Sequence, residues 1–443
     1  MTGYKKLYGI ICVLLVLSAK PVFADVVRDT IPATTEAATE GEILVEVNAT
    51  DKNAVFENTA KFIFTVNNTT ATEQVGKISW VLTSVTGQKL KHDAIDVRVS
   101  GKAIGKYNFD IDAADPGFYK VDFMINVTEY DDTLHKAFGI RPERIKSEHP
   151  RPVDFDAFWE IAKVELAKVK PEFKCILKPE LSTPSRNVYL IEMKSLGNVL
   201  VRGWLTEPAV KNKKFAVILG LPGYQIALPP VFGEDRDVAF ISLNVRGQGN
   251  SRTNINTRAE EYIVHHIENK DKYVMRGVIM DCIRAIDFIY SRDELRHDKI
   301  FVKGGSMGGF LAMATASLDK RVGLCSAQSP IFSDIRSVVN EVDFPIKSIK
   351  KYITTQPGLT VNKILDNLDY YDVKNFAPNI TCKILMSIGL LDTYIPPSND
   401  YTVFNLLKTN KRILIFRDLG HDVSPKYIEL ELAWMHDEFG LFL

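Results

Sequence analysis

The sequence predicts an α/β protein in two parts: a small antiparallel β-sandwich, then a larger unit built on a mostly parallel sheet with helices on both faces. Apolar and polar residues alternate with a period of two across residues 43 to 140, which is typical of antiparallel strands with one buried face. From residue 141 onward, continuous apolar segments alternate with helical patterns, which indicates parallel strands and covering helices. The chain has 443 residues, enough for both parts.

The first 24 residues have the anatomy of a secretory signal peptide. Two lysines precede an apolar run from Leu7 to Leu17, and a small-residue site at 22 to 24 follows. The run is short for a membrane anchor, which is the alternative reading. We therefore expect cleavage near Ala24, a secreted or periplasmic protein, and no transmembrane segment after cleavage. Residues 25 to 42 are rich in Thr, Ala and Glu without periodicity and are predicted to form a linker.

The strands of the predicted sandwich lie in residues 43 to 140. The clearest alternation runs from Tyr119 to Val127 and follows an Asp-Pro-Gly turn. Several such strands about ten residues apart predict a small antiparallel sandwich of the immunoglobulin-like type. No nucleophile, base and acid occur together in this part, so we expect it to supply no catalytic group.

The α/β unit is predicted to span residues 141 to 443. Asp154 or Asp156 can cap its first helix, which Pro171 bounds. Residues 332 to 376 interrupt the alternation and are expected to form a cap insertion, with Phe344 and Tyr352 as walls of the site. The expected strands lie at 187–206 (a hairpin), 215–220, 238–245, 299–303, 322–327, 382–388 and 411–416, and the later helices at 273–291, from Gly308, and at 425–438.

Composition restricts the partners and cofactors. Lys plus Arg and Asp plus Glu both number 55, and this balance gives no electrostatic footprint for nucleic acid. Four cysteines remain after the signal peptide, and they form no CxxC or Cys/His cluster, so we expect no metal site and no cofactor. Buried free thiols are the favoured state, and a disulfide stays open. These cysteines are Cys175, Cys282, Cys325 and Cys382.

Ser306 is the predicted nucleophile. It is the centre of Gly304-x-Ser306-x-Gly308, between an apolar strand and a helical pattern that starts at Phe310. A nucleophile elbow needs this arrangement, because the serine is strained and its neighbours must be small for strand and helix to approach. The positive end of the helix would also lie where an oxyanion forms.

The base and the acid are predicted from chain order. In α/β-hydrolases they follow the serine as acid, then histidine. Of the two histidines beyond Ser306, His421 lies in a Gly-containing loop after a strand, whereas His436 falls in the last amphipathic helix. Asp392 follows the preceding apolar strand and is the predicted acid. Asp418, on the same loop as His421, is the main competitor, although a solvated or turn-capping role suits it better.

The oxyanion hole requires two backbone N–H donors. Met307 directly follows the nucleophile and is expected to supply one. The loop after the strand at 215 to 220 reads LPGYQIALPP, and Tyr224 is the best candidate there for the other.

These motifs make the sequence similar to a known family. It resembles carbohydrate esterase family seven, the acetyl xylan esterases and cephalosporin C deacetylases, over roughly residues 140 to 443. Arg-Gly-Gln-Gly is the most specific match, because other serine hydrolases usually lack it at this place. The matching pieces are RPVDFDAFW at 151–159, PGY at 222–224, RGQGNS at 246–251, GGSMGG at 304–309, LLDTYIPP at 390–397 and GHD at 420–422.

The resemblance implies the α/β-hydrolase fold. It also implies the same catalytic triad and oxyanion donors that the motifs themselves predict. The implied triad is Ser306, Asp392 and His421, and the implied oxyanion donors are the backbones of Tyr224 and Met307. Arg246 and Gln248 match a motif that the resemblance implies to be structural. The family usually has Gln in place of Met307 and Glu in place of Asp422, and its members are often single-domain hexamers. Substrate range and homo-oligomerisation therefore stay open.

The leading functional hypothesis is an exported serine esterase that removes acetyl groups from xylan, its fragments or another small acetyl ester. A general carboxylesterase is the nearest alternative. A peptidase related to prolyl oligopeptidases is disfavoured, because about 100 residues are too few for its propeller. The non-enzymatic alternative is a glycan- or partner-binding protein with an inactive hydrolase fold, against which the complete Ser, Asp and His set argues.

Overall fold

The computed structural model describes residues 41–84, 87–255, 257–340 and 342–441. The predicted signal peptide, and the predicted linker up to residue 40, lie outside the described residues. Within the described ranges, no helix combines the length and apolar character needed to cross a membrane.

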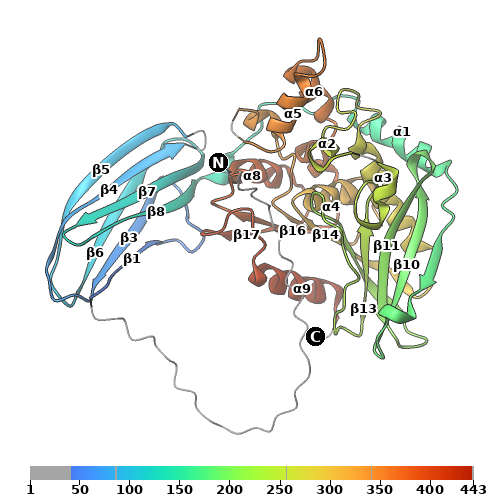
Figure 1. Cartoon of the computed structure of the whole chain (residues 1–443), viewed down its shortest axis with the longest axis horizontal. Coiled ribbons are helices and arrows are strands. Elements are labelled where there is room, and N and C mark those ends of the chain that lie inside the picture. The colour runs from blue at the N-terminus through green and yellow to red at the C-terminus, as the bar shows by residue number, and fades with distance from the viewer. Residues whose placement is uncertain (1–40, 85–86, 256, 341, 442–443) are drawn as a thin grey trace, which may run out of the picture.

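Strands β1 to β8 form the predicted N-terminal sandwich from two sheets (Figure 1). One sheet has the order β1-β3-β6 and the other β2-β8-β7-β4-β5, and every pairing is antiparallel except that of the two-residue β2. The prediction of an antiparallel sheet domain is confirmed. The strands are β1 Ile43–Ala49, β2 Val55–Phe56, β3 Thr59–Asn68, β4 Gln74–Ser84, β5 Lys89–Val99, β6 Ala103–Asp112, β7 Gly117–Val127 and β8 Tyr130–Ile140.

A cluster of phenylalanine rings joins the two sheets of the sandwich. Phe123 of β7 is fully buried, and its ring centroid lies 5.3 Å from Phe62, 6.2 Å from Phe64 and 5.3 Å from Phe109. Edge contacts of this kind add to the free energy gained by burying the rings. Period two places these residues on the inward faces, which is why the alternation in the sequence predicts the domain.

The second unit contains a nine-stranded sheet with the order β17-β16-β15-β14-β12-β13-β11-β10-β9. Strands β12 to β17 pair with one another in parallel. Strands β9, β10 and β11 pair antiparallel, and β11 joins β13 in the same way, so the prediction of a mostly parallel sheet is confirmed. The strands are β9 Lys174–Leu177, β10 Arg186–Ser195, β11 Val199–Pro208, β12 Phe215–Gly220, β13 Val238–Asn244, β14 Leu295–Gly305, β15 Leu324–Gln328, β16 Lys383–Gly389 and β17 Lys411–Phe416.

Helices cover both faces of this sheet (Figure 1). Alternate residues of β12 enter different cores: Val217 and Leu219 share one with α3 and α4, and Ile218 shares the other with α9. Both faces are buried, so the central strands read as continuous apolar runs. The helices are α1 Phe155–Ala167, α2 Ala259–Tyr262, α3 Val274–Tyr290, α4 Met307–Leu318, α5 Ile346–Ile353, α6 Val361–Leu368, α7 Val373–Phe376, α8 Pro397–Leu406 and α9 Pro425–Phe439.

The predicted cap insertion, residues 332 to 376, contains α5, α6 and α7. Figure 1 shows α5 and α6 projecting beyond the end of the sheet where α2 also lies. Helix α8 lies between the sandwich and the large sheet in the same view.

Replacing Phe123 with Ala should lower the free energy of unfolding of the sandwich by about 3–5 kcal/mol, because it leaves a cavity among three rings. Denaturant unfolding followed by circular dichroism measures the change. Phe123→Leu is the control and should cost less, because more of the volume remains filled. A loss below about 1 kcal/mol for Phe123→Ala would contradict this view of the core.

Candidate active site

Ser306 occupies the sharp turn between β14 and α4. Its backbone has φ 56° and ψ −117°, a conformation that L-residues rarely adopt and that stores strain. Surrounding hydrogen bonds hold it there. The Ser306 N–H donates to the Gln328 carbonyl at 2.8 Å, and the Ser306 carbonyl accepts from the N–H groups of Phe310 and Ile331 at 3.1 and 3.2 Å. The turn therefore has the geometry expected of a nucleophile elbow.

Two glycines make this turn sterically feasible. A Cβ on Gly304 would lie 2.5 Å from the carbonyl carbon of Gly308, and a Cβ on Gly308 would lie 2.4 Å from the carbonyl oxygen of Leu221. Real Cβ atoms do not approach backbone atoms so closely. The spacing Gly304-x-Ser306-x-Gly308 thus lets the helix contact both its own strand and the loop after β12.

The predicted serine, histidine and aspartate come together in one hydrogen-bonded chain. His421 Nε2 lies 3.0 Å from Ser306 Oγ, and His421 Nδ1 lies 2.7 Å from Asp392 Oδ2. Ser306 follows β14, Asp392 follows β16 and His421 follows β17, so their side chains meet at the carboxyl end of three parallel strands. The distances fit a nucleophile, a base and an orienting acid.

Backbone donors fix the Asp392 carboxylate. Its Oδ1 accepts from the N–H groups of Tyr394 at 2.8 Å and Ile395 at 2.9 Å, which leaves Oδ2 for His421. The Asp392 side chain is 1% exposed, against 21% for that of His421. Burial and the Asp392 charge raise the pKa of the fully buried Asp400 on α8 well above its usual range. A protonated Asp400 would add no second negative charge beside Asp392.

The loop that carries His421 is held from several sides. The Leu391 N–H donates to the Leu419 carbonyl at 3.0 Å, and Gln328 Nε2 donates to the Asp422 carbonyl at 2.9 Å. A Cβ on Gly389 would lie 2.2 Å from the carbonyl oxygen of Gly420, so a glycine is needed where β16 passes this loop.

The two rival residues have other partners. The Asp418 carboxylate pairs with Lys136 of the sandwich at 2.7 Å. His436 is buried in α9, and its Nε2 lies 2.7 Å from Asp235 Oδ2. Neither residue is hydrogen-bonded to Ser306 or His421 among the described contacts.

The two predicted oxyanion donors lie on segments in contact with each other. Met307 is the first residue of α4, so its N–H is among the four that have no acceptor within the helix. The loop Leu221–Tyr224 starts with a 2.9 Å bond from Leu221 N–H to the Lys303 carbonyl, and it packs against Gly308. The Tyr224 side chain points elsewhere: its hydroxyl donates to the Ala259 carbonyl and accepts from the Ile263 N–H. Burial raises the pKa of this hydroxyl.

The aromatic residues of three nearby segments differ in their contacts, and only Tyr394 is in ring contact with a residue of the triad among the described contacts. The ring of Phe344, in the cap segment, lies 5.0 Å from that of Tyr224, whereas Tyr352 is directed to Glu268, whose carboxylate accepts from its hydroxyl at 2.9 Å. Tyr394 lies 5.4 Å from the His421 ring and is 38% exposed. Tyr394 was not among the predicted site residues, and its position two residues after Asp392 is the signal in the sequence that indicates it.

Arg246 and Gln248 brace the neighbourhood of the site, as the resemblance implied. The Arg246 guanidinium forms a buried pair with Asp281, at 2.6 Å from Nη2 to Oδ1 and 2.9 Å from Nε to Oδ2. Gln248 Nε2 donates to the Met307 sulfur at 3.7 Å. Tyr262 donates to the Arg246 carbonyl at 2.7 Å. These contacts tie the segment after β13 to α3 and to the start of α4.

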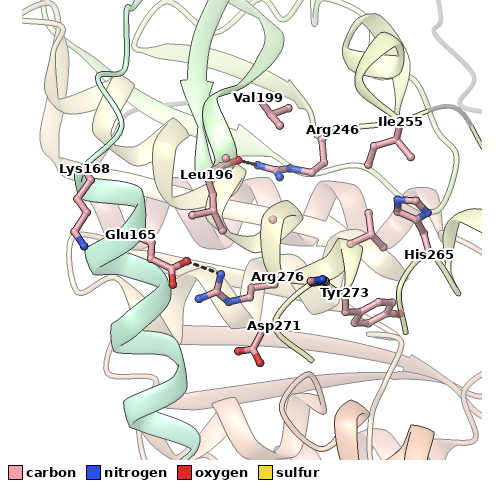
Figure 2. Close-up of a pocket in the computed structure, with 14 residues that line it drawn as sticks. Glu165, Lys168, Leu196, Val199, Arg246, Ile255, His265, Asp271, Tyr273 and Arg276 are labelled. Atoms are coloured by element: carbon pink, nitrogen blue, oxygen red, sulfur yellow. Dashed lines mark hydrogen bonds and ion pairs between the residues drawn. The ribbon is translucent and has the colours of Figure 1, made fainter. Parts of the chain in front are cut away.

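A surface hollow of about 540 Å³ lies beside Arg246 and the N-terminus of α3. Figure 2 shows Arg276 reaching Glu165 across it, at 2.7 Å, and Arg246 on its upper wall. Ser306, Asp392 and His421 do not line this hollow. Among the described residues, no group of three or more His, Cys, Asp or Glu is arranged to hold a metal ion. The four described cysteines are free thiols.

Comparison with known proteins identifies relatives of the second unit. The family model "Acetyl xylan esterase (AXE1)" matches residues 142–438, starting just after β8. The chain is 29% identical over 314 residues to the acetyl esterase Axe7A of Xylanibacter ruminicola, which covers 68% of this chain and 70% of that protein.

Two solved structures share the fold. The acetyl xylan esterase from Paenibacillus sp. R4 superposes with a TM-score of 0.61 and 26% identity, over 67% of this chain and 98% of that one. Acetyl xylan esterase 1 from Thermoanaerobacterium sp. JW/SL YS485 has a TM-score of 0.60 and 22% identity, over 68% and 98%. The α/β-hydrolase fold and the resemblance to carbohydrate esterase family seven are thereby confirmed. This chain is a carboxylic ester hydrolase and belongs to the acetyl xylan esterase family.

Proposed function

We propose that this protein is an exported serine esterase that removes acetyl groups from xylan or xylo-oligosaccharides. The observation that carries the proposal is the continuous hydrogen-bonded chain from Ser306 Oγ through His421 to the buried Asp392, within a chain of the acetyl xylan esterase family. Acetyl esterase chemistry is common to the named relatives. Xylan as the substrate is supported by the family to which the chain belongs.

In the first half of the reaction, His421 Nε2 removes the proton of Ser306 Oγ as this oxygen attacks the acetyl carbonyl carbon. The 3.0 Å separation suits that transfer. The tetrahedral oxyanion would accept hydrogen bonds from the backbone N–H groups of Met307 and Tyr224. His421 then gives the proton to the ester oxygen of the sugar as the bond from the acetyl carbon to this oxygen breaks, so the sugar leaves as a free hydroxyl and an acetyl-enzyme remains on Ser306.

In the second half, water attacks the acetyl-enzyme while His421 takes its proton. The same oxyanion donors serve again, and acetate leaves as Ser306 regains its proton. Asp392 holds the His421 ring in the productive tautomer and stabilises the imidazolium. The two backbone donors to Asp392 Oδ1 restrict its rotation, which supports this role.

A small acyl pocket is what the family resemblance implies, and two aromatic contacts accompany the site. Phe344 of the cap segment packs on the Tyr224 ring, so the cap segment lies against the loop that carries one proposed oxyanion donor. Tyr394 offers a half-exposed aromatic face beside His421, where the alcohol part of the ester would lie. Export rests on the signal-peptide pattern of residues 1 to 24.

The proposed triad predicts a graded set of losses. Ser306→Ala and His421→Ala should each lower kcat on a soluble acetyl ester by roughly 10⁴-fold or more, because the three residues act as a unit. Asp392→Ala should cost less, since the acid orients and stabilises the base. His436→Ala is the control and should leave turnover per folded molecule nearly unchanged. An active His421→Ala enzyme beside an inactive, folded His436→Ala enzyme would refute the assignment.

The oxyanion hole can be tested through Gly308. In Gly308→Ala the new Cβ meets the Leu221 carbonyl, so the loop that carries Tyr224 must move away from Met307. We expect kcat to fall about 10²- to 10³-fold, as when one donor is lost. Gly220→Ala is the matched control, because its Cβ would lie 3.6 Å from the Ile241 carbonyl oxygen, an ordinary contact. Equal activity of the two variants would argue against Tyr224 as a donor.

The acetyl specificity can be tested with acetyl, butyryl and octanoyl esters of one leaving group. Each methylene without a pocket forfeits about 0.8 kcal/mol of burial and can clash, so kcat/KM should fall steeply with chain length. An optimum at butyryl or longer would favour a general carboxylesterase. Acetate release from acetylated xylan and from acetylated xylo-oligosaccharides then tests the carbohydrate part. An enzyme that prefers acetyl esters but releases no acetate from either carbohydrate would contradict the assignment of a carbohydrate substrate.

A further inference from the structure

The apolar core of the sandwich does not end at the sandwich. It includes three buried residues of the hydrolase unit: Ile388 of β16, Leu390 just after it, and Tyr401 of α8. The rings of Phe118 on β7 and Tyr401 lie 5.4 Å apart. Partly buried Leu391 and Ile415 pack against the same core. The sandwich is therefore packed against the strands that carry two of the proposed catalytic residues.

The hydrolase residues of this shared core lie close in sequence to the proposed acid and base. Leu390 and Leu391 immediately precede Asp392, and β17, which contains Ile415, leads into the loop of His421. Ser306 is different, because β14 lies in the middle of the sheet, between β12 and β15. The strand residues before Ser306 are buried in the cores formed with α3, α4 and α9. Within the described part of the chain, the apolar core shared with the sandwich thus includes residues of the acid and base segments and none of the nucleophile's strand.

A polar contact joins the sandwich to the base loop directly. Lys136 of β8 reaches Asp418 at 2.7 Å, three residues before His421. The Lys136 side chain is 23% exposed and that of Asp418 is 58% exposed. Its neighbour His135 points to the other face of β8 and pairs with Asp122, inside the sandwich, also at 2.7 Å. Adjacent residues of one strand therefore make one contact across the domain boundary and one within the domain.

We propose that the sandwich positions the catalytic acid and base, through the apolar contact of Phe118 with Tyr401 and the ion pair of Lys136 with Asp418. Catalysis then depends on residues that belong to the sandwich and touch neither substrate nor the reacting atoms. A small displacement of His421 relative to Ser306 slows proton transfer in both halves of the reaction. This inference rests on the proposed function of Ser306, His421 and Asp392.

The apolar contact is tested with two matched substitutions in the full chain, Phe118→Leu and Phe109→Leu. Phe118 is 3% exposed and contacts Tyr401, whereas Phe109 is 4% exposed and contacts Phe64 and Phe123 within the sandwich. The substrate is 4-nitrophenyl acetate, and active sites are counted by labelling with a fluorophosphonate. We expect Phe118→Leu to lower kcat per labelled site about ten-fold with KM little changed. Phe109→Leu should lower thermal stability but retain the wild-type kcat.

The ion pair is tested by charge exchange. Lys136→Met and Asp418→Asn should each lower kcat roughly three- to five-fold, and the double variant should lose no more than either one. The exchange Lys136→Asp with Asp418→Lys should recover much of the lost turnover. His135→Ala is the control on the same strand and should keep the wild-type kcat. A merely structural role would change the folded fraction, not kcat per labelled site.

The outcomes separate this inference from the proposed function. A wild-type chain that hydrolyses no acetyl ester and is not labelled by the fluorophosphonate would contradict the proposed function itself. The wild-type chain could instead be active while Phe118→Leu has the same kcat as Phe109→Leu, and Lys136→Met the same kcat as His135→Ala. That result would overturn the positioning role alone. Loss of kcat confined to Phe118→Leu, Lys136→Met and Asp418→Asn, with recovery on charge exchange, would establish it.

Discussion

The strained backbone of Ser306 is the constraint on which the rest of the site depends. A positive φ at a serine persists only if the surroundings over-determine it. Here β15 supplies an acceptor and two later N–H groups donate to the serine carbonyl. The same turn forces glycine at 304 and 308, and the second glycine lets the loop after β12 lie against α4. One local conformation therefore fixes the nucleophile and brings the two proposed oxyanion donors together.

Much of this arrangement could be predicted from the sequence, because it depends on local patterns. The apolar run "FAVILG" predicts a strand at 215–220, and β12 has those bounds. Ser306, Asp392 and His421 each follow such a strand, and parallel strands bring their carboxyl ends to one edge of a sheet. Their meeting thus follows from topology once the strands are recognised. The elbow could also be predicted, because its strain restricts the residues on either side.

Contacts between distant segments could not be predicted in this way. The pair of Lys136 with Asp418 joins residues 282 positions apart, and neither residue has a local pattern that indicates the other. On sequence alone Asp418 is therefore a competitor for the role of the acid, and its pairing with Lys136 is what gives it a different place. The burial of Asp400 is similar, since a single Asp in a short helix gives no sign that it lies beside Asp392. The interrupted alternation of residues 332 to 376 predicts the cap segment, but the direction of Tyr352 toward Glu268 depends on packing.

The surroundings of the three strands explain where additional support is needed. β14 is buried on both faces by helices, so Ser306 is held by the centre of the sheet. β17 is the edge strand, so it has a neighbouring strand on one side only, unlike β14, and its residues are only partly buried. The bonds to that loop come from β15, from the segment after β16 and from the sandwich. Proton transfer tolerates little change in distance. The base at the sheet edge is therefore the part of the proposed triad for which an added domain has the most to contribute.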